Sequence, residues 1–165
     1  MSSEGTPASQ NPGANQGRPG APNLQVMAQY IKDLSFENPG APGNNPNVRP
    51  QIDLGVDLQA KRLDQERFEV ELKLRVTAKA EEKALFLLEL VYAGMFGIQN
   101  APEEIVQQFL LIEGPHILFP FARRIVADVI RDGGMPPLMI EPIDFAALYR
   151  ARQAGAAQQA PQMVV

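Results

Sequence analysis

One stretch of the chain decides the fold: Phe68-Glu69-Val70-Glu71-Leu72-Lys73-Leu74-Arg75-Val76-Thr77, in which apolar and polar side chains alternate throughout. Successive side chains of a strand point to opposite faces of a sheet. The pattern therefore predicts an antiparallel strand over about 68–79, with one buried face and one solvated face. The stretch 52–60 alternates in the same way, and 26–36 alternates over its second half. Both are predicted to be strands of the same sheet.

The next stretch, 84–96, predicts a fourth strand that is apolar on both faces. One face carries Leu85, Leu87, Val91 and Met95 with Glu89, and the other carries Phe86, Leu88, Leu90, Tyr92 and Phe96. A single layer of helices buries only one face of a sheet. We expect a second copy of the chain to cover the other face. The alternative is that the C-terminal helices cover both.

Helical signals follow the strands. Pro102, Glu103 and Glu104 suit the first turn of a helix, which is predicted to break or kink at Gly114-Pro115, to bend near Pro120 and to end at Gly133-Gly134. An extended segment over 135–142 precedes a short last helix, for which Asp144 is the predicted N-cap. The predicted fold class is α+β: a four-stranded antiparallel sheet with two C-terminal helices on one face, the first long and broken.

Composition divides the 165 residues into three parts. Residues 1–23 and 153–165 are rich in small and polar side chains, which bury too little apolar surface to offset the entropy of ordering. They are predicted to be a disordered extension and a disordered tail, and 24–152 to be the folded domain. The N-terminus lacks a secretory signal, and no apolar run approaches the ~20 residues that span a bilayer. We therefore expect a cytoplasmic protein that does not insert into membranes.

Several function classes are disfavoured. The chain has no cysteine and one histidine, His116, so thiol catalysis and cysteine-built metal sites are excluded. The net charge of −4 argues against nucleic-acid binding. Asp33 and Glu37 share a predicted strand face but lie about 13 Å apart at ~3.3 Å per residue, too far for a glycosidase pair. We predict a protein that binds other polypeptides and does not catalyse a reaction.

Four segments carry a family resemblance: Tyr30-Ile31-Lys32-Asp33-Leu34-Ser35-Phe36-Glu37-Asn38-Pro39, Gly114-Pro115-His116-Ile117-Leu118-Phe119-Pro120-Phe121-Ala122-Arg123, Gly134-Met135-Pro136-Pro137-Leu138 and Pro142-Ile143-Asp144-Phe145-Ala146-Ala147-Leu148-Tyr149. Over roughly 24–150 the chain resembles SecB, a family of bacterial export chaperones. The resemblance implies a homotetramer, built as a dimer of dimers, that binds unfolded secretory preproteins and delivers them to the motor ATPase SecA. It also implies that the protein uses no cofactor. An alternative is a SecB-like chaperone dedicated to one client, such as a toxin–antitoxin partner.

The resemblance also assigns residues to three surfaces. Asp33, Glu37, Leu87 and Glu89 would dock SecA; Ile52, Leu54, Val56, Leu138, Ile140, Phe145 and Leu148 would line the client groove; Leu88, Leu90 and Tyr92 would lie at the tetramer interface. Taken without the resemblance, the acidic residues also fit an ordinary solvated face, and the groove residues also fit core packing. The C-terminal tail is not acidic, which departs from many family members and leaves a tail contact with SecA in doubt.

Overall fold

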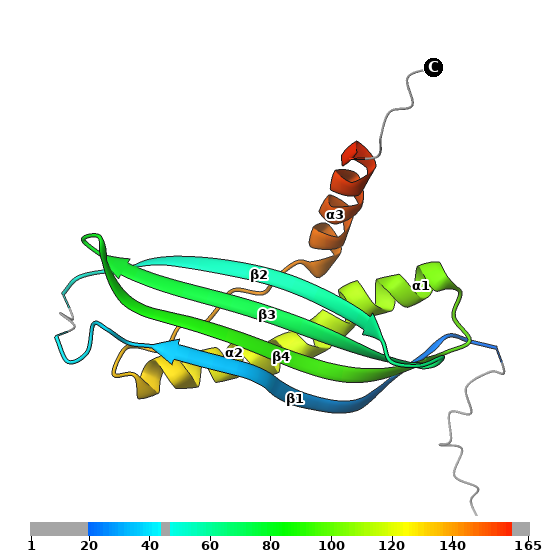
Figure 1. Ribbon diagram of the computed structural model, residues 1–165, viewed down its shortest axis with the longest axis horizontal. Helices are drawn as coiled ribbons and strands as arrows, with labels where there is room; N and C mark the ends of the chain where they lie inside the picture. Colours follow the sequence, from blue (N-terminus) through cyan, green and yellow to red (C-terminus); the bar gives the residue numbers. More distant parts are fainter. Residues whose placement is uncertain (1–19, 44–46, 160–165) are drawn as a thin grey trace, which may run out of the picture.

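The computed structural model describes residues 20–43 and 47–159, and its centre is one antiparallel sheet (Figure 1). The strands are β1 (Asn23–Glu37), β2 (Gln51–Arg62), β3 (Arg67–Ala80) and β4 (Lys83–Gln99). All four predicted strands are confirmed, each longer than its pattern indicated. The order in the sheet is β1-β4-β3-β2, so β1 and β2 are the edges and the connection between them crosses one end of the sheet.

A two-residue turn joins β3 to β4. Ala80 and Lys83 are cross-strand partners, and Glu81 and Glu82 between them have φ of 50° and 68°. Two consecutive left-handed residues are typical of a type I′ turn, whose twist matches that of the flanking strands. Glutamate has a Cβ and is disfavoured in this region, where Asn-Gly is preferred. The turn is therefore formed by residues that do not favour it.

A continuous helical segment covers one face of the sheet: α1 (Glu103–Gln108), η1 (Phe109–Glu113) and α2 (Gly114–Asp132) (Figure 1). The predicted break at Gly114-Pro115 is wrong, because the chain forms a π-helical turn there and continues. Pro115 has no N–H and its ring would clash with a carbonyl of a regular α-helix. The wider π turn, in which the Gly114 N–H bonds to the Phe109 carbonyl, accommodates it.

The combined helix Glu103–Asp132 has 30 residues, and its length and composition alone would allow it to cross a membrane. The sequence prediction concerned an uninterrupted apolar run, and Gln107, Gln108 and Glu113 interrupt the apolar stretch of this helix. In this fold it is instead a core helix, and Leu118, Ala122 and Val126 on its sheet-facing side are fully buried. Gly94 on β4 lets the helix approach closely, since a Cβ there would lie 2.8 Å from Leu118 Cδ2.

The last helix, α3 (Phe145–Gln159), begins as predicted, with Asp144 Oδ1 accepting from the Ala147 N–H at 2.9 Å. It rises past the β2 edge instead of lying flat on the sheet (Figure 1), and it reaches the core beside the long helix through Phe145. Arg152 ties α3 to that edge by donating to the Leu58 carbonyl at 3.1 Å and to Asp57 Oδ1 at 2.6 Å. The helix continues past 152, so part of the predicted disordered tail is helical; 1–19 and 160–165 lie outside the described residues.

Candidate protein-interaction surfaces

The four predicted docking residues lie on the sheet face opposite the helices. In the β1–β4 register Ser35 is opposite Glu89 and Glu37 is opposite Leu87, and directly opposed residues share a face. Asp33, one alternate position along β1, faces the same way. We call Asp33, Glu37, Leu87 and Glu89 the outer acidic patch. No described helix covers this side of the sheet (Figure 1).

The three carboxylates of the outer acidic patch differ in their partners. Glu89 Oε1 lies 3.4 Å from Arg75 Nε on the neighbouring strand β3, and both side chains are largely exposed. Within residues 20–43 and 47–159, Asp33 and Glu37 form no ion pair. Their charges are therefore directed to solvent on a flat surface, which suits a basic protein partner better than a small substrate.

A hydrogen-bonded cluster lies beside this patch on the same face. Glu69 on β3 is 8% exposed, which makes it the one buried charged side chain of the described residues. It accepts from Tyr30 Oη and, at 2.6 Å, from Lys32 Nζ, and Lys32 also bonds to Glu71. The two donors, Lys32 first, hold the pKa of Glu69 below its usual range. Burial and the bond to Glu69 raise the pKa of Tyr30 to about 12.

The predicted groove residues all lie on the helix side, but their exposure differs. Leu54 and Leu148 are exposed, and Ile52, Val56 and Leu138 are half-buried against the core. Ile140 and Phe145 are 5% and 3% exposed, so their assignment as client contacts is wrong for this conformation: they anchor the extended segment and α3. Phe145 packs edge-on against Phe119 of α2, with ring centroids 6.1 Å apart. Met139 is 59% exposed, the highest value among the large apolar side chains of the described residues. It was not among the residues predicted to line the groove.

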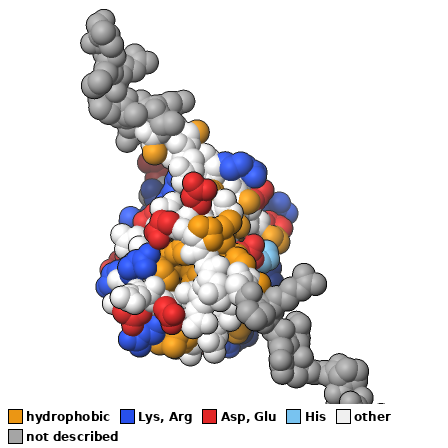
Figure 2. Space-filling view, turned by 90° about the vertical axis from the view of Figure 1, so that its right-hand side faces the viewer, with side chains coloured by type: hydrophobic (Ala, Val, Ile, Leu, Met, Phe, Trp, Pro, Cys, Tyr) orange, Lys and Arg blue, Asp and Glu red, His pale blue; other side chains and the backbone are white. Residues whose placement is uncertain are grey.

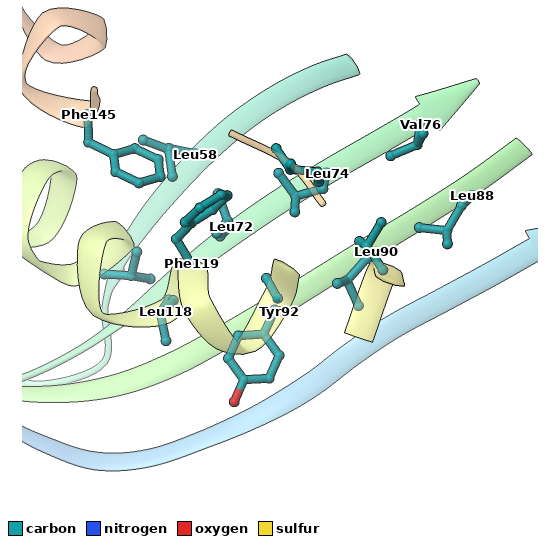
Figure 3. Close-up of a cluster of buried hydrophobic side chains, with 14 of the residues drawn as sticks. Leu58, Leu72, Leu74, Val76, Leu88, Leu90, Tyr92, Leu118, Phe119 and Phe145 are labelled. Atoms are coloured by element: carbon teal, nitrogen blue, oxygen red, sulfur yellow. The ribbon is translucent and has the colours of Figure 1, made fainter. Parts of the chain in front are cut away.

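The predicted tetramer residues are buried within a single chain. Leu88 and Leu90 are fully buried and Tyr92 is nearly so, all beneath α2 (Figure 3). Tyr92 stacks on Phe121 of α2 with ring centroids 6.3 Å apart, and its hydroxyl bonds to Gln29 at 3.2 Å. The helices cover that face of β4 within a single chain, and the assignment of these residues to a tetramer interface stays a prediction. The opposite face of β4, with Leu87 and Val91 half-buried, is the uncovered one.

A different apolar surface is exposed at the β1 edge of the helix side. Its members are Val26, Ile31, Leu34 and Phe121, which are 39% to 48% exposed. Ile31 is opposite Tyr92 in the register, and Tyr92 stacks on Phe121, so strand and helix contribute to one surface. We call these four residues the β1 edge patch. Apolar side chains also appear between charged ones at the end of the molecule seen in Figure 2.

Comparison with known proteins agrees with this architecture. The family model described as preprotein translocase subunit SecB matches residues 17–156. The chain belongs to the SecB family. A protein-export protein SecB from Parvibaculum lavamentivorans is 50% identical over 165 residues, which cover 98% of this chain and 95% of that one. Another, from Dinoroseobacter shibae, is 48% identical with both chains fully covered. The SecB family comprises protein-export chaperones, not enzymes.

A solved structure shares the SecB-like fold at low sequence identity. It is the SecB-like chaperone of Mycobacterium tuberculosis in complex with a ChAD peptide from an antitoxin. The TM-score is 0.63 at 18% identity, covering 73% of this chain and 90% of that one. The four-stranded sheet with C-terminal helices is thus the fold of a chaperone known to bind a peptide. Among the residues that our structure describes, no group of three or more metal-ligating side chains occurs.

Proposed function

We propose that this SecB family member is a cytoplasmic holdase, which binds unfolded secretory preproteins and delivers them to the motor ATPase SecA. The observation that carries the proposal is the division of the sheet into two faces. The helix side exposes apolar side chains around Leu54, Met139 and Leu148, while the uncovered side exposes the outer acidic patch. One chain can therefore bind an apolar client and a basic partner on opposite sides.

The client surface is proposed to lie between β2 and the segment that leads into α3. Leu54, Met139 and Leu148 would contact the client first, with the half-buried Ile52, Val56 and Leu138 behind them. Flexible methionine and branched side chains suit binding of many unrelated apolar sequences. Ile140 and Phe145 hold the segment in place and would contact a client only if α3 moved.

The assembly is proposed to be a homotetramer, a dimer of dimers, in which copies meet through the β1 edge patch. β1 is an edge strand of 15 residues, so one row of its N–H and C=O groups has no partner in the sheet. Such an edge is a template for pairing with another strand. The exposed apolar side chains of the patch beside it would be removed from water by the same contact.

Calorimetry tests client binding directly. An unfolded secretory polypeptide should bind, and the same polypeptide in its folded form should not, because only the unfolded chain exposes extended apolar segments. Equal binding of both forms, or of neither, would contradict a holdase.

Docking is tested with Asp33→Lys combined with Glu37→Lys, which reverses the two unpaired charges of the outer acidic patch. Binding of purified SecA should weaken at least tenfold, while affinity for the unfolded polypeptide stays unchanged. The matched control, Glu104→Lys with Glu113→Lys, reverses two exposed charges on the helical segment and should leave SecA binding within twofold. If the control weakens binding as much as the patch variant does, net charge and not the patch determines docking.

A chaperone dedicated to one client is the second candidate, favoured by the fold shared with the SecB-like chaperone that binds an antitoxin peptide. Affinities measured for several unrelated unfolded polypeptides separate the two proposals. Similar affinities support the general holdase, whereas a preference of a hundredfold or more for one polypeptide supports the dedicated chaperone.

A further inference from the structure

β1 contains a bulge next to the outer acidic patch. Ile31 is opposite Tyr92 and Asp33 is opposite Val91, so Lys32 is an extra residue without a cross-strand partner. Side chains alternate along a strand, and one extra residue reverses the phase of everything that follows. In a regular ladder that continued from Tyr30 and Ile31, Asp33 and Glu37 would point to the helix side. The bulge is the reason that both carboxylates point outward.

The cluster around Glu69 holds this bulge. Lys32, the extra residue, reaches over β4 to β3 and bonds to both Glu69 and Glu71, and Tyr30 on the other side of the bulge bonds to the same Glu69. Glu69 would be costly to bury without partners, because an uncompensated buried charge is strongly destabilising. Its two donors therefore fix the positions of the residues on either side of Ile31.

We infer that Lys32 and Glu69 are positioning residues, which keep β1 in the register that directs Asp33 and Glu37 to a basic protein partner. The inference rests on the docking function proposed above. Removal of the cluster would release the extra residue, so that the end of β1 could slip by one position. Docking would then be lost although neither patch carboxylate had been changed.

A cysteine pair reports the register without reference to docking. The chain has no cysteine of its own, so Ser35→Cys with Glu89→Cys places two thiols directly opposite each other. The ~4.5–5.5 Å between opposed Cα atoms lies within the range that a disulfide bridges. Under mild oxidation this pair should crosslink in an otherwise unchanged chain, and a slip of one residue should prevent it.

The test combines this reporter with Lys32→Met and Glu69→Gln. The crosslinked fraction should fall at least threefold. In chains that carry the two substitutions without the cysteines, the affinity for purified SecA should fall at least fivefold. The affinity for an unfolded polypeptide should stay within twofold. Lys32→Arg in place of Lys32→Met, with Glu69 unchanged, keeps the positive charge and should restore both the crosslinked fraction and the affinity for SecA. The control Arg62→Met with Glu103→Gln removes an exposed ion pair of 3.0 Å elsewhere and should change neither measurement.

An unchanged crosslinked fraction, or SecA affinity within twofold of the parent chain, would overturn the inference. If the double variant fails to fold, Lys32→Met alone removes the bonds of the extra residue while Tyr30 still donates to Glu69, and the same criteria apply. If reversal of Asp33 and Glu37 leaves SecA binding intact, the docking proposal fails, and the crosslink still decides whether the cluster sets the register.

Discussion

Replacement of Leu88 by alanine distinguishes a core position from a subunit interface. Leu88 lies on β4 under α2 and has no exposed surface within a single chain. Leu→Ala at such a site removes apolar contacts and leaves a cavity, at a cost of about 2–5 kcal/mol. A loss of about 3 kcal/mol would lower the Tm of a domain of this size by about 6–12 °C. The assembly should remain intact at temperatures where the variant is folded, because no contact between copies has been changed.

Urea unfolding followed by circular dichroism gives the free energy of unfolding, and sedimentation gives the mass. Both are measured at one protomer concentration, since association contributes to apparent stability. The matched control is Leu34→Ala in the β1 edge patch, where Leu34 is 40% exposed. Leu34→Ala should lower the sedimentation mass of the assembly at low protomer concentration. It should lower the free energy of unfolding by less than about 1.5 kcal/mol, because the Leu34 side chain is only partly buried. If Leu88→Ala dissociates the assembly with a stability change under about 0.5 kcal/mol, the side chain faces another copy and the proposed assembly is wrong.

Three further outcomes are expected. Arg75→Gln should strengthen SecA binding about two- to fivefold in calorimetry at low salt, because it frees Glu89 from an exposed ion pair of 3.4 Å that is worth about 0–1 kcal/mol; weaker binding would mean that Arg75 itself contacts SecA. Glu81→Asn with Glu82→Gly should stabilise the fold by about 1–2 kcal/mol in urea unfolding, since both positions have positive φ; a loss of stability would show that the glutamate side chains make a favourable contact. The pKa of Tyr30, about 12 in the fold and 10.0 ordinarily, keeps the phenol protonated longer in the folded chain. The free energy of unfolding should therefore fall from pH 10 to 12, and Tyr30→Phe should make that fall shallower; an identical fall in both proteins would contradict this.

Side-chain alternation was sufficient to predict β2 and β3. Along 52–60 and 68–79 each apolar residue faces the helices and each polar one faces outward, as a half-buried antiparallel sheet requires. The N-cap at Asp144 was equally predictable, because the capping hydrogen bond is local. The strand order could not be predicted, because nothing in a local pattern shows that β1 crosses the sheet to pair with β4.

The interaction surfaces could be predicted only in part, because a local pattern does not show what packs against a strand. Alternation showed that β4 is apolar on both faces, and it could not show which face the helices of the same chain would cover. The resemblance assigns Leu88 and Leu90 to the tetramer interface, and within a single chain both residues are buried beneath α2. The resemblance grouped the four residues of the outer acidic patch, whereas alternation alone placed Asp33 with Glu37, and Leu87 with Glu89, on one face of each strand.

The two bulges in β1 explain why its apolar residues could not be read by alternation. Val26, Ile31 and Leu34 share the helix side although they are five and three positions apart, because the register shifts between Val26 and Ala28 and again between Ile31 and Asp33. The second shift has two consequences at once: it turns Asp33 outward and leaves Leu34 on the edge that we propose for assembly. A slip that buries the carboxylate would also move Leu34 to the outer face. The proposed docking surface and the proposed assembly edge therefore depend on one bulge, and a variant of β1 must be measured for both before either effect is assigned to a contact.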